Sequence, residues 1–98
     1  MIMRVFQVVT HPGKEEEFAE FFFHSAVPMM KATKGIVQVL PGAPRPETPR
    51  EFSLIMIWED LDALKAFVGE DYQDAHIDPA EAELVAFRTI RHYEFSGS

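Results

Sequence analysis

Apolar residues recur in four short segments with the alternation or density that is typical of β-strands. These segments are residues 2–10, 36–40, 52–58 and 87–95. Two other stretches, 14–33 and 61–68, carry apolar residues at helical spacing. A second start of the later helix follows at Asp78-Pro79-Ala80-Glu81, where an N-cap residue, a proline and an acid stand in the favoured order. The resulting order, β-α-β-β-α-β, predicts an α+β, ferredoxin-like fold with a four-stranded antiparallel sheet and helices on one face.

The ends of the predicted helices carry recognisable signals. Three glutamates, residues 15–17, open the first helix where the helix dipole favours acids, and Gly35 ends it. Pro28 lies inside that helix and is expected to kink it or to end its first part, because its ring displaces a backbone hydrogen bond. Asp60 is the expected N-cap of the second helix, and Gly69 is its expected end.

Apolar residues cover well over half the circumference of the first helix. At 100° per residue, Phe18 and Phe22 lie on one stripe, whereas Phe23 and Val27 lie on another. One stripe can pack on the sheet. The other needs the second helix, a ligand or another chain, and packing against the second helix is the simplest of these.

Both faces of the predicted sheet are apolar. In the third strand, alternate residues such as Phe52 and Trp58 point one way, and Ile55 and Ile57 point the other way. In the first strand, Ile2, Phe6 and Val8 oppose Met3, Val5 and Val9. Two helices cover only one face, so we expect a homodimer whose sheets pack face to face.

Composition narrows the classes of partner. The formal net charge is −7, which argues against nucleic acid and against anionic membranes. Nine acidic residues and a single basic one, Lys65, lie between Glu59 and Glu83. We interpret this stretch as a solvent-exposed face, and a cation-binding site is the alternative. There is no cysteine, no signal-peptide pattern and no apolar run long enough to span a membrane, so a cytoplasmic location is expected.

Four segments carry a resemblance to a known family: HPGKEEEFAEFF, the exit from Pro28 to Gly35, WEDLDALKAF, and RTIRHYEF. On these, the chain resembles the antibiotic biosynthesis monooxygenase (ABM) domain proteins of the dimeric α/β-barrel superfamily. The resemblance implies one domain over residues 1–95, followed by a flexible tail, 96–98. It also implies a dimer whose two sheets close into a barrel, with a pocket between sheet and helices in each protomer.

The resemblance also implies candidate activities. Haem-degrading members use an Asn on the first strand, a Trp on the second helix and a His that ligates iron; the matching positions here are Gln7, Phe67 and His76. Two of the three residues differ, and an acidic neighbourhood suits haem propionates poorly. Haem binding is therefore the lesser alternative, and no cofactor is expected.

Cofactor-free oxygenases of the family use Asn, Trp, Tyr and His around the pocket, and the counterparts here are Gln7, Trp58, Tyr72 and His76. In that chemistry the substrate supplies the electrons as a phenolate, and the protein supplies a base, an apolar cavity and hydrogen-bond donors. His76 or Tyr72 would deprotonate or orient the phenol, and Gln7 and Trp58 would hold it.

Each of these residues also has a plainer interpretation. His76 could be an exposed loop histidine, Tyr72 an anchor for its loop, and Trp58 a core residue. The amide of Gln7 could hold a substrate oxygen or simply satisfy a neighbouring polar group. His24 either pairs with Glu20 on the surface or reaches the edge of the pocket. The expected pocket wall consists of Phe18, Phe22 and Phe67.

The sequence offers a possible anion site but no metal-binding motif. Arg4, Arg88 and Arg91 could bind a carboxylate, although ion pairs at strand ends are the default. No histidine pair has metal-binding helical spacing, and no acidic run matches a calcium loop. The resemblance therefore implies a monooxygenase acting on a small aromatic or phenolic molecule. The alternative is a non-catalytic dimer, a ligand-binding or stress-associated module of the same fold.

Overall fold

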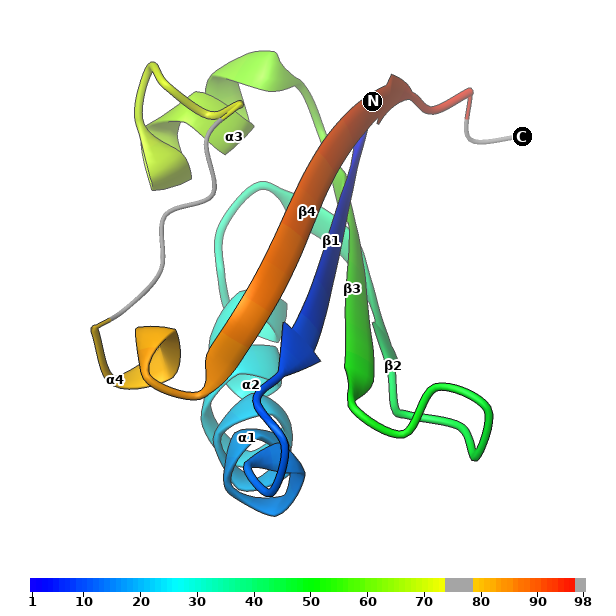
Figure 1. Ribbon diagram of the computed structural model, residues 1–98. Helices are drawn as coiled ribbons and strands as arrows, with labels where there is room; N and C mark the ends of the chain where they lie inside the picture. The colour runs from blue at the N-terminus through cyan, green and yellow to red at the C-terminus, as the bar shows by residue number, and fades with distance from the viewer. Residues whose placement is uncertain (74–78, 97–98) are drawn as a thin grey trace.

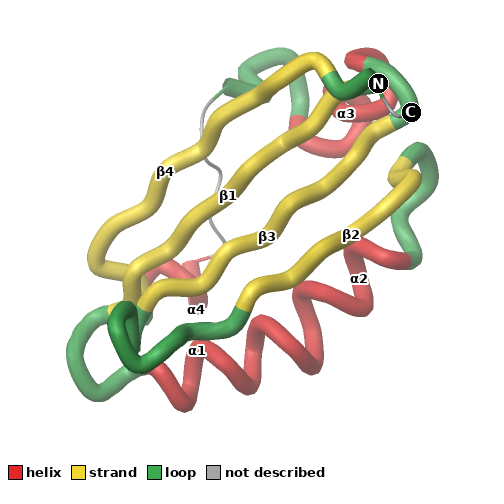
Figure 2. The backbone as a smooth tube through the Cα atoms, turned by 90° about the vertical axis from the view of Figure 1, so that its right-hand side faces the viewer, coloured by secondary structure: helices red, strands yellow, loops and turns green. Residues whose placement is uncertain are grey.

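Four β-strands form one sheet, and the helices lie behind one of its faces (Figures 1 and 2). The structure is a computed structural model that describes residues 1–73 and 79–96. The elements are β1 (Ile2–Thr10), α1 (Glu15–Phe21), η1 (Phe22–Ala26), α2 (Val27–Lys31), β2 (Ile36–Gly42), β3 (Glu51–Trp58), α3 (Leu61–Val68), α4 (Pro79–Ala82) and β4 (Val85–Glu94).

The strand order is β2-β3-β1-β4, and every neighbouring pair is antiparallel. The predicted ferredoxin-like α+β fold is thereby confirmed. The register places Arg4 of β1 opposite Met56 of β3 on one side and opposite His92 of β4 on the other. Residues that are directly paired across antiparallel strands share a face of the sheet, so these three side chains lie in one row.

The first helical stretch is continuous in space but changes its hydrogen-bonding pattern along the way. The predicted kink at Pro28 takes the form of a π-helical segment, η1, immediately before the proline. A proline ring clashes with the carbonyl four residues earlier, here that of His24, and a wider turn relieves such a clash. The helix ends at Lys31 rather than at residue 33 as predicted, and Gly35 follows in the left-handed region with φ of 92°.

The turn after α2 has no room for a side chain. A Cβ built on Gly35 would lie 2.7 Å from the Cβ of Ala63 on α3, closer than real carbon atoms approach. The glycine therefore lets β2 start directly beside α3. Helix α3 itself agrees with the prediction: Asp60 caps it by accepting a hydrogen bond from the backbone N–H of Ala63 at 2.8 Å, and Gly69 ends it with φ of 98°.

The last helix and strand lie close to their predicted positions. Helix α4 begins at Pro79, as the proline at the first helical position indicated. The expected N-cap, Asp78, lies outside the described residues. Strand β4 begins at Val85, two residues before the predicted start, and the backbone N–H of Phe95 donates to the carbonyl of Met1, which ties the two ends of the chain together (Figure 1).

The core lies between the helices and the even-numbered side of β1 and β3. Phe18 packs edge-on against Phe52, with 4.7 Å between ring centroids, and against Phe22 at 5.6 Å. The first helix therefore places one of its two predicted stripes on the sheet. Phe18 and Trp58 are fully buried.

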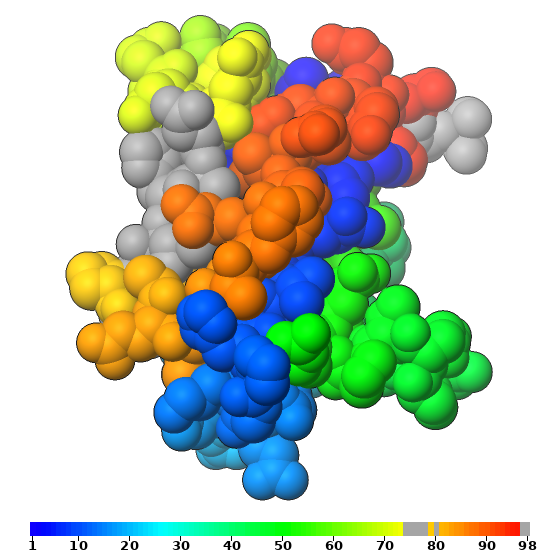
Figure 3. All heavy atoms as spheres, viewed as in Figure 1, coloured from blue at the N-terminus to red at the C-terminus, as the bar shows by residue number. Residues whose placement is uncertain are grey.

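No helix in the described part of the chain covers the other face of the sheet (Figure 2). Leu40, Phe87 and Tyr93 on this face are 44%, 61% and 54% exposed. The space-filling view shows the side chains of β4 at the surface beside those of β1 (Figure 3). We call this surface the outer face; it is formed by alternate residues of all four strands, including Val5 and Ile55.

Candidate functional site

A cavity of about 290 Å³ lies between the sheet and the helices. Its wall is mostly apolar and comes from β1, β3, the first helical stretch and α3; the lining side chains used below are Phe6, Phe22, Ala26, Met29, Trp58 and Phe67. Three polar side chains, Arg4, Ser25 and Glu81, also line it. An apolar cavity with a few polar groups has the usual character of a small-molecule site.

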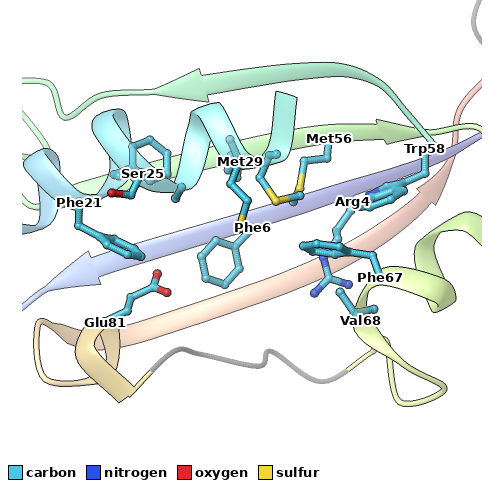
Figure 4. A pocket seen from close by; sticks show the side chains of 14 residues that line it. Arg4, Phe6, Phe21, Ser25, Met29, Met56, Trp58, Phe67, Val68 and Glu81 are labelled. Carbon is cyan, nitrogen blue, oxygen red and sulfur yellow. The ribbon is translucent and has the colours of Figure 1, made fainter. Parts of the chain in front are cut away.

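The polar groups lie at opposite ends of this cavity (Figure 4). Arg4 lies at one end beside Trp58 and Phe67, and Glu81 lies at the other with Ser25. The stretch between them is apolar. The cavity is therefore suited to a molecule with an apolar body and polar groups at its ends.

The π-helical segment contributes directly to this wall. Phe22, Ser25 and Ala26 all come from η1, and Met29 follows in α2. A π-turn inserts an extra residue in the turn and alters which side chains face the sheet, and such turns recur at functional sites. Pro28 is thus one local cause of the shape of the cavity.

Arg4 is the buried cation of the site, with 6% of its surface exposed. Its Nη1 donates hydrogen bonds to the backbone carbonyl of Tyr72 at 2.8 Å and to Nε2 of His92 at 2.9 Å. Desolvation by burial lowers the pKa of the Arg4 guanidinium to about 10. No carboxylate among residues 1–73 and 79–96 lies within ion-pair distance of it.

The contact with Arg4 determines the state of His92. A guanidinium has donors only, so Nε2 of His92 must accept, and the proton of the neutral ring is on Nδ1. Burial first, and the positive charge of Arg4 second, lower the pKa of His92 below its ordinary value. His92 is therefore held neutral and orients the guanidinium rather than acting as a free base through Nε2.

Trp58 forms the wall beside Arg4 and is fully buried. The ring of Phe67 lies over it, with 5.5 Å between centroids. The indole Nε1 is closed off from solvent and has no hydrogen-bond partner among the described residues. A buried N–H without a partner is unfavourable for folding.

Three of the predicted pocket residues, Phe22, Trp58 and Phe67, line the cavity. Phe18 does not: it lies behind the wall in the core. His24 is at the surface, with its Nε2 3.7 Å from a carboxylate oxygen of Glu20, which is the plainer of its two interpretations.

The predicted catalytic residues are not brought together in the described part of the chain. Gln7 lies on the outer face of the sheet, where its Oε1 accepts a hydrogen bond from the hydroxyl of Thr89 at 3.3 Å. Gln7 does not line this cavity, because odd-numbered residues of β1 point away from the helices, and its bond to Thr89 fits the plainer of its two interpretations. His76 lies outside the described residues.

Tyr72 borders the site without lining it. Its ring packs edge-on against His92, with 5.1 Å between centroids, and Nζ of Lys65 lies 5.8 Å from the centre of the tyrosine ring. Its backbone carbonyl accepts from Arg4. Tyr72 therefore anchors its segment beside the Arg4 end of the cavity.

Sequence reasoning offered Arg4 as a possible carboxylate-binding residue but favoured an ion pair at a strand end, and it did not place His92 or Glu81 at the site. A signal for Arg4 was present: it lies between Ile2 and Phe6 in the set of β1 residues that alternate toward one face. A charged residue within such an apolar set is rarely buried without a function or a partner. No comparable local signal marks His92, whose contact with Arg4 spans 88 positions of the chain.

The described residues hold no group of three or more His, Cys, Asp or Glu side chains that could bind a metal ion. Nor does the described part of the chain contain a helix that is long and apolar enough to cross a membrane.

Comparison with models of protein families shows which family this chain belongs to. The model of the family "antibiotic biosynthesis monooxygenase" matches residues 1–78. The chain belongs to the ABM family. No curated protein matched the sequence.

Solved structures share the fold of this ABM chain. Protein SO0527 from Shewanella oneidensis superposes with a TM-score of 0.78 at 20% identity, over 94% of this chain and 87% of that one. PA3566 from Pseudomonas aeruginosa gives 0.72 at 17% identity, over 97% and 94%. A variant of SnoaB, a cofactor-independent oxygenase from Streptomyces nogalater, gives 0.68 at 16% identity, over 99% and 94%. At these identities the likeness establishes the fold.

Proposed function

We propose that this chain is a cofactor-independent monooxygenase that oxidises a small phenolic aromatic molecule in the cavity between sheet and helices. The observation that carries the proposal is the cavity itself: about 290 Å³, mostly apolar, in a chain of the ABM family. That volume is near the lower end of the range for ligand pockets, and it suits two or three fused rings. The fold shared with a cofactor-independent oxygenase supports the same reaction class.

The reaction can proceed with the substrate as the only reductant. A phenol and O₂ give a quinone and water. The ring loses its phenolic proton and one ring hydrogen, four electrons pass to O₂, one oxygen atom becomes the new carbonyl, and the other leaves as water. The protein has to favour the phenolate, exclude bulk water and accept the ring proton when the O–O bond breaks.

Several residues can serve these steps. Trp58, Phe22 and Phe67 would hold the rings, since their side chains form the wall. Tyr72 and His76 remain the proposed groups for orienting or deprotonating the phenol. Glu81 at the opposite end of the cavity offers a carboxylate that could accept the ring proton.

The test is oxygen uptake with a panel of hydroxylated naphthalenes and anthracenes. We expect uptake with at least one of them, and one atom of isotopically labelled oxygen in the quinone product. Ala26→Phe fills the cavity from η1 and should lower the rate by roughly tenfold or more. Ala32→Phe adds the same ring at an exposed position outside the cavity and is the control. Absence of uptake with every compound, in protein that is folded, would overturn the proposal for this substrate class.

A second candidate is a non-catalytic module that binds a similar molecule. The position of Gln7 on the outer face favours it, because one of the three predicted catalytic residues is then absent from the cavity. The two candidates differ in one result: a binding module would gain thermal stability with ligand and consume no oxygen.

We also propose that the chain forms a homodimer through its outer face. Exposed apolar side chains on β2 and β4, with partly buried ones on β1 and β3 between them, support this, since a surface of this kind is usually covered in solution. Light scattering during size-exclusion chromatography measures the mass directly. A monomer at all concentrations would contradict the proposal.

A further inference from the structure

Arg4 is a buried charge whose hydrogen-bonding capacity is only partly used. A guanidinium has five N–H donors, and the two hydrogens of Nη1 account for the bonds to Tyr72 and His92. Its Nε and Nη2 donors have no hydrogen-bond partner among the described residues. Three donors and a full positive charge therefore remain at this end of the cavity.

Keeping such a cation in an apolar wall is costly for folding. Charges removed from water are ordinarily paired, and the lowered pKa of Arg4 reflects the lack of compensation. Replacement by an apolar residue of similar length would remove that cost. An unpaired cation in a cavity is thus a reason to look for a ligand that supplies the negative charge.

The surroundings hold the guanidinium in place for that role. His92 accepts from Nη1 as a neutral ring, and the carbonyl of Tyr72 accepts from the same nitrogen, so Arg4 is fixed from the sheet side and from the segment after α3. Neither contact neutralises the positive charge. The rings of Trp58 and Phe67 form the apolar wall beside it.

We propose that the Arg4 end of the cavity recognises an anionic oxygen group, a carboxylate or a phenolate, at one end of an aromatic ligand. Arg4 is the specificity-determining residue, and His92 is a positioning residue that acts through it. The inference deepens the proposed function and rests on it in one respect: in the oxygenase, this group is the phenolate of the substrate. A fixed cation next to that oxygen favours the ionised form that reacts with O₂.

The experiment compares two probes of nearly equal shape, 2-naphthoate and its neutral amide, 2-naphthamide, by calorimetric titration of the full chain at about pH 7. Neither is a phenol, so binding is measured without turnover. We expect the carboxylate to bind roughly tenfold more tightly than the amide or better. Equal affinities, tighter binding of the amide, or no binding of either probe would overturn the proposal.

Variants test whether Arg4 causes the preference for naphthoate over naphthamide. In Arg4→Gln the preference should fall to about twofold or less, and Arg4→Lys should restore part of it. Arg88→Gln removes the same charge from an exposed position on β4 and should leave the preference intact. A preference that survives in folded Arg4→Gln overturns the assignment. If that variant does not fold, Arg4→Lys is the second test: it keeps the charge but loses the planar fork of donors, so the preference for naphthoate should fall below that of wild type, and an unchanged preference overturns the assignment.

A third probe separates phenolate from carboxylate. Phenols ionise near pH 10 in water, and 2-naphthol bound beside Arg4 should ionise at a lower pH, which its absorbance spectrum records. No such shift beside a clear preference for naphthoate would identify a carboxylate site and contradict the phenolate. Oxygen uptake distinguishes the two proposals. A preference for naphthoate without oxygen uptake would overturn only the monooxygenase proposal, and oxygen uptake without that preference would overturn only the anion-site proposal.

Discussion

The two faces of the sheet use the same four strands for different purposes. On the inner face, alternate residues of β1 and β3 pack under the helices and leave a cavity with one buried cation, Arg4. On the outer face, the residues between them form an apolar surface on which Gln7 and Thr89 make a side-chain hydrogen bond. Polar groups are present on both faces, but those of the inner face lie under the helices and those of the outer face lie where no helix covers them.

Arg4 and Gln7 are two polar residues of β1 that lie on opposite faces of the sheet. They are three positions apart on one strand, and an odd separation puts them on opposite faces. The amide of Gln7 is exposed, so water can satisfy it. Arg4 is buried and its guanidinium lines the cavity, so protein groups and the contents of the cavity satisfy it. A polar residue within an apolar strand indicates a site only once its face is known.

The largest expected effect comes from placing one charge on each face in turn. Phe52→Glu puts a carboxylate against Phe18 and Phe22 in the core, at a position that is 1% exposed. Burying an unpaired acid there costs several kcal/mol, comparable to the whole stability of a domain of this size, and the chain should unfold. Circular dichroism and urea titration measure the loss.

Ile55→Glu, on the outer face of the same strand, should instead leave the fold intact and raise the dimer dissociation constant by about 100-fold or more. Val5 and Leu40 are its cross-strand neighbours, and neither offers a positive charge. Ile55→Leu is the matched control. A folded Phe52→Glu variant, or a full dimer in Ile55→Glu, would contradict the division between the faces.

Local signals in the sequence were sufficient for most of the fold. Asp60 and Gly69 mark the ends of α3 because capping and the left-handed conformation depend on residues close in sequence. The π-helical segment before Pro28 was not foreseen beyond a kink, since several distortions can relieve the same proline clash.

The candidate site was less predictable because its contacts are long-range. Arg4 meets Tyr72 and His92 only after the sheet has formed, across 68 and 88 positions of the chain. Phe22, Trp58 and Phe67 could be assigned to the wall from the family resemblance. The position of Gln7 outside the cavity could have been predicted, since strand alternation places it with Val5 rather than with Phe6.

A smaller effect should follow from the lowered pKa of His92. Above the ordinary histidine pKa of about 6.5, the ring is neutral in both the folded and the unfolded chain, and it contributes no pH dependence. As the pH falls below that value, the unfolded chain binds a proton that the folded chain resists, so the free energy of unfolding decreases. The decrease ends once the pH is below the folded-state pKa.

His92→Gln keeps an acceptor for Arg4 and removes the titration. Melting temperatures of wild type and variant, measured between neutral and mildly acidic pH, should therefore converge as the pH falls. Parallel curves would show that His92 does not carry the effect. The same variant reports on positioning: it should change the preference for naphthoate over naphthamide less than Arg4→Gln does, since the cation remains.

The smallest expected effect is that of Gln7→Ala. The side chain lies on the outer face and bonds to Thr89, so the cavity should keep its shape and its charge. Oxygen uptake, and the affinity for 2-naphthoate, should then change by about twofold or less, and the free energy of unfolding by about 1 kcal/mol or less. Arg4→Gln, three positions away, is the matched comparison on the inner face. If Gln7→Ala abolished turnover while Arg4→Gln did not, the reactive group would be on the outer face, and the chemistry would have to take place between two sheets rather than beneath the helices.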